Sequence, residues 1–135
     1  MKAIQSVLMA SSQKNSPYDF WNEALSEAVI YGHLTLFKDE GDGAVIPDPE
    51  ESGLFRRSVG EYHGQLRDWR ATIAGSEKGV HLREYSDRFE LHIDRFDPYK
   101  HPLKHLVFDS PGTLFGLIGA FFMGAMFLGI LRRKR

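Results

Sequence analysis

The sequence predicts an α+β protein in which a small antiparallel β-sheet and an N-terminal amphipathic helix are followed by a single C-terminal transmembrane helix. Three observations lead to this fold class. Residues 17–31 repeat apolar side chains at helical spacing, and residues 80–96 alternate apolar and polar side chains as a half-buried strand pair does. Residues 113–131 form an apolar run without a charge, which is typical of a membrane span.

The composition excludes several functions. The chain of 135 residues has no cysteine, so it carries no disulfide, thiolate zinc site, iron–sulfur cluster or cysteine nucleophile. Its 17 Lys and Arg residues nearly balance its 18 Asp and Glu residues, so we expect no nucleic acid partner. The mean hydropathy is −0.32, but the apolar residues gather towards the C-terminus. We expect a flexible tail over residues 1–15, a soluble domain over 16–109 and a membrane anchor over 110–135.

The first predicted helix has a strong start signal. Ser16 is a good N-cap, Pro17 suits the first helical position, and Asp19 stands where a capping box places its acid. Gly32 is expected to end this helix, and residues 33–37 to form a short strand. The apolar face, which we expect to pack in the core, consists of Phe20, Trp21, Ala24, Leu25, Ala28 and Val29.

Two segments in the middle of the chain are less regular. Residues 39–53 hold six acids and no base, together with Gly and Pro, so we expect a solvated acidic loop. The alternative is that this acidic loop attracts a metal ion or a basic partner. Residues 55–73 fit both a helix and a strand. Because Gly60 and Gly64 would each cost a helix about 1 kcal/mol, we prefer a strand over residues 66–73.

The clearest element of the domain is a β-hairpin over residues 80–96 with a two-residue turn at Ser86 and Asp87. One face then pairs Val80 with Ile93, Leu82 with Leu91 and Glu84 with Phe89, and the other face pairs His81 with His92, Arg83 with Glu90 and Tyr85 with Arg88. A slip by one residue would place apolar side chains opposite polar ones, so the register is well specified. We expect this sheet to pack on the first predicted helix.

The C-terminal run has the length and composition of an anchor. At 1.5 Å per residue, residues 113–131 reach about 28 Å, close to the ~30 Å hydrocarbon core of a bilayer. The run has no ionisable residue, so we expect no ion or proton pathway in it. Small residues recur at every fourth position, at Gly112, Gly116, Ala120 and Gly124, and a second pair with the same spacing follows at Ala125 and Gly129. They predict close packing with a second copy or with a partner subunit.

Basic residues flank the predicted span. The expected membrane-interface residues are Lys100 and Lys104 before it, and Arg132, Arg133, Lys134 and Arg135 after it. Pro102 permits a helical turn ahead of the span, from which Leu103, Leu106 and Val107 can enter the interface. The C-terminal bases slightly favour a domain outside the cytoplasm. The N-terminal residues make a weak secretory signal, however, so we expect a tail-anchored, single-pass protein with its domain in the cytoplasm.

Two histidine pairs are candidate metal ligands. His81 and His92 face each other across the predicted hairpin, and His101 and His105 share one helical face beside the membrane. Two ligands do not make a site, so the first pair needs a third group, such as His33, His63, Asp94 or a ligand from a neighbouring chain. The alternatives are solvent-facing histidines without a ligand for the first pair, and contact with lipid headgroups for the second.

A short motif pattern follows the hairpin. The hairpin ends in Asp97-Pro98, a Pro-Leu-x-His-Leu turn follows, and Asp-x-Pro completes the pattern; the remaining matching residues are Pro102, Leu103, His105, Leu106, Asp109 and Pro111. In these features residues 79–111 resemble a segment of small archaeal membrane-associated proteins. The resemblance covers about a quarter of the chain. It implies an archaeal membrane setting and indicates no particular activity.

The motifs of common enzymes are missing from the sequence. It has no phosphate-binding glycine loop, dinucleotide fingerprint or nucleophile elbow, so we predict no catalytic residue, no cofactor and no enzymatic activity. The expected function is that of an anchored, non-catalytic accessory, assembly or interaction subunit. Its expected partners are the lipid bilayer and either further copies of itself or a larger membrane complex. The alternative is a membrane-tethered sensor that binds a metal or ligand through the histidine pairs.

Overall fold

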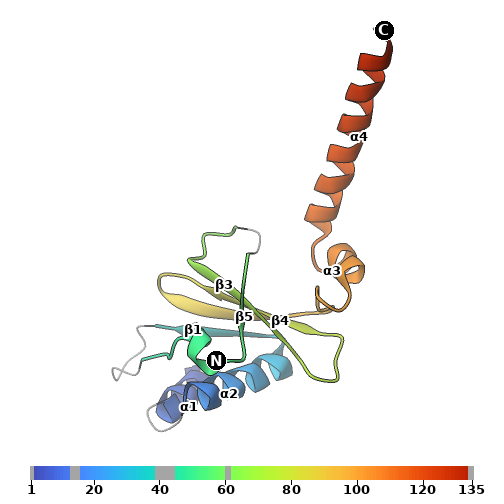
Figure 1. The fold of residues 1–135 in the computed structure, drawn as a ribbon. Helices are drawn as coiled ribbons and strands as arrows, with labels where there is room; N and C mark the ends of the chain where they lie inside the picture. The colour runs from blue at the N-terminus through green and yellow to red at the C-terminus, as the bar shows by residue number, and fades with distance from the viewer. Residues whose placement is uncertain (1, 13–15, 39–44, 60–61, 134–135) are drawn as a thin grey trace.

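An antiparallel sheet with two helices under one face forms most of the protein in the computed structural model, which describes residues 2–12, 16–38, 45–59 and 62–133 (Figure 1). In chain order the elements are α1 (Lys2–Ser12), α2 (Pro17–Tyr31), β1 (His33–Phe37), the 3₁₀ turn η1 (Pro49–Ser52), β2 (Arg56–Ser58), β3 (Arg67–Thr72), β4 (Gly79–Glu84), β5 (Arg88–Asp94), α3 (Pro102–Phe108) and α4 (Pro111–Arg133).

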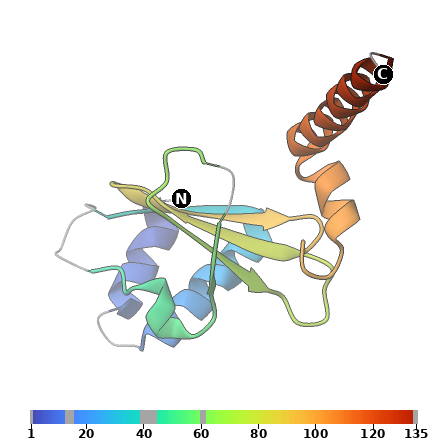
Figure 2. The same ribbon diagram turned by 45° about the horizontal axis from the view of Figure 1, so that its top comes forward.

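The sheet is antiparallel throughout, and its two faces have different surroundings. Within the described residues it has five strands in the order β1-β5-β4-β3-β2. Figures 1 and 2 both show α1 and α2 beneath one face of the sheet, whereas α3 and α4 leave the domain on the opposite side. The predicted α+β class with an antiparallel sheet and an apolar C-terminal helix is therefore confirmed.

The capping signals place α2 where the sequence predicts it. The Ser16 hydroxyl accepts a hydrogen bond from the Asp19 N–H at 3.2 Å, and the Asp19 carboxylate accepts one from the Ser16 N–H at 3.3 Å, which completes the capping box. Gly32 ends the helix with a φ of 77°, a conformation that glycine adopts without strain. The chain turns directly into β1, which covers the predicted residues 33–37.

The hairpin of β4 and β5 has the predicted register. Val80 lies opposite Ile93 and Leu82 opposite Leu91, and the Tyr85 N–H donates to the Arg88 carbonyl at 2.8 Å beside the two-residue turn. The strand preferred over residues 66–73 is also confirmed, as β3. Sequence reasoning missed β2, because its three residues are polar and show no apolar alternation.

The flexible tail predicted for residues 1–15 is wrong where the structure describes it. Residues 2–12 form α1, in which Leu8 is only 1% exposed and packs in the core with partly buried Ile4. Gln5, which interrupts the apolar stretch in the sequence, is buried and donates from Nε2 to the Phe37 carbonyl at 2.9 Å. A tertiary hydrogen bond thus offsets the cost of burying this amide.

The described part of the acidic segment is not the solvated loop that the composition of residues 39–53 predicts. Residues 39–44 lie outside the described residues, but residues 45–53 pack against the domain, with Pro49 and Ser52 buried. Asp48 caps η1 by accepting the Glu50 N–H at 2.9 Å. The Trp21 Nε1 donates to the Pro47 carbonyl at 2.9 Å. Short-range caps and a tryptophan from α2 therefore hold this segment in place.

Leu8→Ala tests whether α1 is a packed helix and not a flexible tail. We expect it to lower the free energy of unfolding by about 2–3 kcal/mol, because it removes buried methyl groups from a packed site. The matched control is Val7→Ala, whose side chain is 60% exposed and whose loss should cost less than about 0.5 kcal/mol. Urea unfolding of the full chain in mild detergent measures the change in both variants. Equal small effects would contradict the packed helix and support the predicted flexible tail.

Candidate functional site

The most distinctive feature of the described chain is the exposed helix α4. Residues 111–130 within it have a mean hydropathy of 2.0, and no part of this stretch is buried. It is the single helix among the described residues that is long and apolar enough to cross a membrane. Its exposed large apolar side chains are Phe115, Leu117, Ile118, Phe121, Phe122, Met123, Met126, Phe127, Leu128 and Ile130. The structure therefore offers one candidate membrane span, where the sequence predicts the anchor.

The glycines predicted for helix packing lie along α4 without a neighbour from the rest of the described chain. A Cβ atom added at Gly112, Gly116, Gly124 or Gly129 would meet nothing within 4 Å apart from the helix's own nearby backbone. The groove is thus open in the described chain, and its packing role stays a prediction. The side chains of the predicted interface residues Arg132, Arg133, Lys134 and Arg135 lie outside the described residues.

Helix α3 attaches α4 to the end of the sheet through Asp109. The Asp109 carboxylate accepts hydrogen bonds from the backbone N–H groups of Phe96 at 3.0 Å and of Arg95 at 3.3 Å. His105 Nδ1 donates to the Phe96 carbonyl at 2.9 Å and lies 3.2 Å from Asp109 Oδ2. Because a carbonyl only accepts, this nitrogen carries the proton. These contacts fix the junction from which α4 starts.

The turn between β3 and β4 supports the same junction. Glu77 lies 3.4 Å from His101 Nε2 and 3.6 Å from Lys104 Nζ. Lys100 Nζ donates to the Ser76 carbonyl at 3.0 Å and to the Ile73 carbonyl at 3.3 Å. The predicted interface lysines therefore have partners in the domain, although both residues are exposed.

The histidine pairs do not converge on a metal site. His81 and His92 are opposite in register, but His81 Nε2 lies 2.9 Å from Asp68 and His92 Nε2 lies 3.3 Å from Glu90. The His92 ring instead stacks near His33, with centroids 4.9 Å apart. Throughout the described ranges, no group of three or more His, Asp or Glu residues could hold a metal ion. The sensor hypothesis thus gains no geometric support.

His81 belongs to a buried polar network on the sheet face opposite α1 and α2. It is 5% exposed, so it is not the solvent-facing residue that one reading of the sequence expects. Burial, followed by the charges of Arg70 and Arg83, lowers the pKa of His81 to about 4 despite its hydrogen bond to Asp68. Arg70 in turn pairs with Asp94 at 2.7 Å. A neutral imidazole is therefore held among balanced charges at neutral pH.

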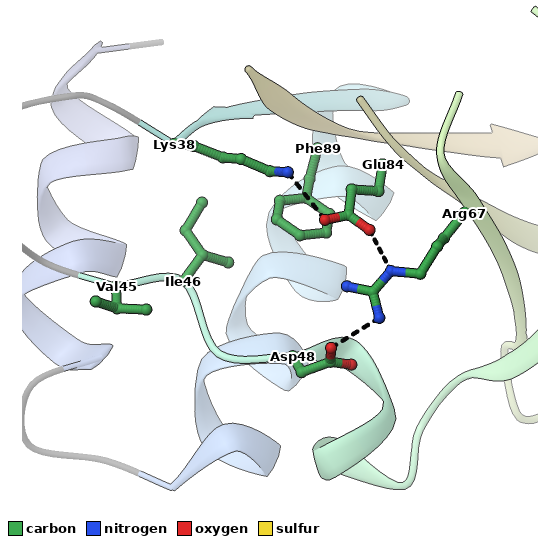
Figure 3. Close-up of a pocket in the computed structure, with 7 residues that line it drawn as sticks. All are labelled: Lys38, Val45, Ile46, Asp48, Arg67, Glu84 and Phe89. Carbon is green, nitrogen blue, oxygen red and sulfur yellow. Dashed lines mark hydrogen bonds and ion pairs between the residues drawn. The ribbon is translucent and has the colours of Figure 1, made fainter. Parts of the chain in front are cut away.

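A charged pocket of about 370 Å³ opens at the other end of the sheet (Figure 3). Glu84 lies between Arg67 and Lys38, with its carboxylate 2.9 Å from Lys38 Nζ, and Arg67 also reaches Asp48 at 2.8 Å. Burial alone would raise the pKa of Glu84, but the hydrogen bonds from Arg67 and Lys38 outweigh it and lower the pKa. The residues lining the pocket are Lys38, Val45, Ile46, Asp48, Arg67, Glu84 and Phe89.

Sequence reasoning missed this network, although one signal for it was present. Glu84 stands on the apolar face of the predicted hairpin, opposite Phe89, where an acid needs a buried partner. That partner, Arg67, also lies over the Trp69 ring at 4.7 Å. Because the two bases drawn in Figure 3 are matched by two acids, the pocket stabilises this corner of the sheet and offers no unbalanced charge to a ligand.

The comparisons with known proteins add no relative. No protein-family model matches the chain, and no curated protein or solved structure matches it. The resemblance of residues 79–111 to archaeal membrane-associated proteins stays a prediction. Function is therefore inferred from the geometry of α4 and of the domain that carries it.

The depressed pKa of His81 predicts acid sensitivity. The unfolded chain takes up a proton near pH 6.5, whereas the folded chain does so only near pH 4, so stability is present above pH 6.5 and is lost as the pH falls. Between pH 7 and pH 5 we expect His81 to account for a loss of about 2 kcal/mol. Urea unfolding at the two pH values should show a smaller loss in His81→Gln. The exposed control His63→Gln should behave like the wild type, and equal losses in all three proteins would contradict this role.

Proposed function

We propose that this protein is a single-pass membrane protein whose α+β domain acts without catalysis, as an accessory, assembly or interaction subunit. The observation that carries the proposal is that no residue of the apolar part of α4 is buried. This stretch of 20 largely apolar residues, 111–130, leaves the domain with none of its length buried. At 1.5 Å per residue it spans about 30 Å, the thickness of a bilayer's hydrocarbon core.

The contrast with the other helices supports an anchor over a displaced core helix. In α2, the residues Phe20, Trp21, Ala24 and Ala28 are fully buried against the sheet. In α4, Phe121 and Met123 are each about three-quarters exposed. Leaving so much apolar surface in water is costly, and lipid removes that cost without any protein contact.

The polar groups of the domain support binding over catalysis. The buried imidazole of His81 is hydrogen-bonded to Asp68, and the carboxylate of Glu84 is bonded to two bases. Groups committed in this way stabilise the fold, whereas a catalytic acid or base needs access to a substrate. We propose that the domain acts through its surface, on the cytoplasmic side of the membrane, with α4 free to pack against another span.

Integral insertion of α4 is tested by extraction at alkaline pH. Wild-type protein in native membranes should stay in the pellet after carbonate treatment, because its span lies in lipid. Ile118→Arg combined with Phe122→Arg should move the protein to the supernatant, since each arginine at the helix centre costs insertion about 2.5–3.5 kcal/mol. The control Ile30→Arg, at an exposed residue of α2, should stay in the pellet. Release of the wild type would refute the anchor.

Packing through the small residues of α4 is tested by adding bulk to the groove. Gly116→Leu combined with Gly124→Leu should reduce crosslinked oligomers or complexes in mild detergent, because the helices can no longer approach closely. Ile118→Phe combined with Met126→Phe adds bulk at the same spacing on the side of Ala125 and Gly129, and should leave assembly through Gly116 and Gly124 intact. Loss of crosslinking in this variant alone would assign the packing to that second small pair. Unchanged crosslinking and size-exclusion behaviour of the glycine variant would remove the packing role.

A further inference from the structure

A second set of exposed apolar side chains lies in the connection between β2 and β3. Val59 is fully exposed, Tyr62 is 80% exposed and Leu66 is 64% exposed. Arg56, in the adjoining strand β2, is exposed as well. Large apolar groups next to a base are unusual in a connection that faces water, and they are typical of segments that contact a lipid surface.

Hydrogen bonds hold this connection onto the sheet. Buried Gln65 accepts the His63 N–H through Oε1 at 2.5 Å and donates from Nε2 to Asp68 at 2.6 Å. The Leu66 N–H donates to the Glu84 carbonyl at 2.7 Å. Gly64 makes the required turn with a φ of 86°. The exposure of the neighbouring Tyr62 therefore belongs to an anchored part of the fold.

The connection lies on the same side of the domain as the candidate span. In both Figure 1 and Figure 2 the described part of the connection between β2 and β3, which includes residues 62–66, rises from the face of the sheet opposite α1 and α2, and α4 leaves the domain towards that side. Helix α3, which leads into α4, exposes Leu103, Val107 and Phe108. Two segments far apart in the sequence thus carry exposed apolar side chains on the side of the domain towards which α4 leaves.

We propose that the β2–β3 connection enters the headgroup layer of the bilayer, so that the sheet face opposite α1 and α2 is turned towards the membrane. This inference rests on α4 being a membrane span. A bilayer is the occupant favoured here because the connection and the candidate span lie on the same side of the sheet in both views (Figures 1 and 2). Tyr62 suits such a layer, since its ring is apolar and its hydroxyl is polar, and Arg56 and Lys104 can approach anionic headgroups.

The proposed orientation leaves α1 and α2 facing the aqueous side. Ile30, near the end of α2, is 70% exposed and offers an apolar side chain on one of these helices. A soluble partner would then meet the helices and not the sheet. The lipid-facing and partner-facing surfaces of the domain would be separated by the sheet itself.

Site-specific labelling tests the orientation, because the chain has no native cysteine. Tyr62→Cys, Ile30→Cys and Phe121→Cys each receive an environment-sensitive fluorophore in the full chain. The proteins are reconstituted in vesicles of phosphatidylcholine and phosphatidylglycerol that carry a quencher in the headgroup layer or in the acyl chains. The Tyr62 label should show blue-shifted emission and about a twofold loss of intensity with the headgroup quencher. The Ile30 label, at a comparably exposed site, should show neither change.

The Phe121 label separates failure of this inference from failure of the anchor. In one outcome the Phe121 label is quenched from the acyl chains, but the Tyr62 label behaves like the Ile30 label. That result would overturn the lipid contact of the β2–β3 connection and leave the membrane span intact. Lack of acyl-chain quenching at Phe121 would overturn both the membrane span and the lipid contact of the β2–β3 connection. A Tyr62 label that is shielded from water but not quenched by lipid would assign the surface to a protein contact and reject the bilayer. Val59→Cys repeats the measurement if Tyr62→Cys does not fold.

Discussion

Trp21 is the contact on which the arrangement of the domain depends. Its buried ring meets Phe55 and Phe89 edge-on, with centroid distances of 5.5 Å in both cases. Its indole nitrogen donates to the Pro47 carbonyl, so the polar end of the side chain is satisfied as well. One residue thereby joins α2, the acidic segment, the residue preceding β2 and strand β5. The apolar faces of the strands turn towards it, and the opposite face of the sheet is left to polar groups.

That opposite face is stable without a second layer of helices because its charges are matched. Asp68 accepts from His81, and Arg70 pairs with Asp94 across the middle strands. Close packing of these groups excludes water from much of the face while the four groups named here keep their hydrogen bonds. On the same face Arg83 Nε and Ser58 Oγ are buried without a hydrogen-bond partner among the described residues. A largely polar face of this kind is compatible with a headgroup layer, since it tolerates a polar neighbour.

The sequence could predict those parts of the fold that short-range chemistry determines. The capping box of Ser16 and Asp19, the register of the β4–β5 hairpin and the apolar run of α4 all depend on residues close together in the chain. It could not predict that Gln5 would bond to Phe37, because that partner is 32 residues away and makes α1 a packed helix. Of the candidate sites, α4 was found, whereas the Arg67–Glu84 network was missed because its four members come from four separate segments of the chain.

The junction at Asp109 has a mechanical consequence. Its carboxylate is bonded to the backbone at the end of β5, and residues from α3 and the β3–β4 turn brace the same point. A domain joined to its anchor by a flexible linker would rotate freely, and its orientation would not depend on the tilt of the anchor. If α4 spans a membrane, a tilt of the helix imposed by a thinner bilayer or by a neighbouring helix would be transmitted through α3 to the sheet. The domain would then change its orientation together with its anchor.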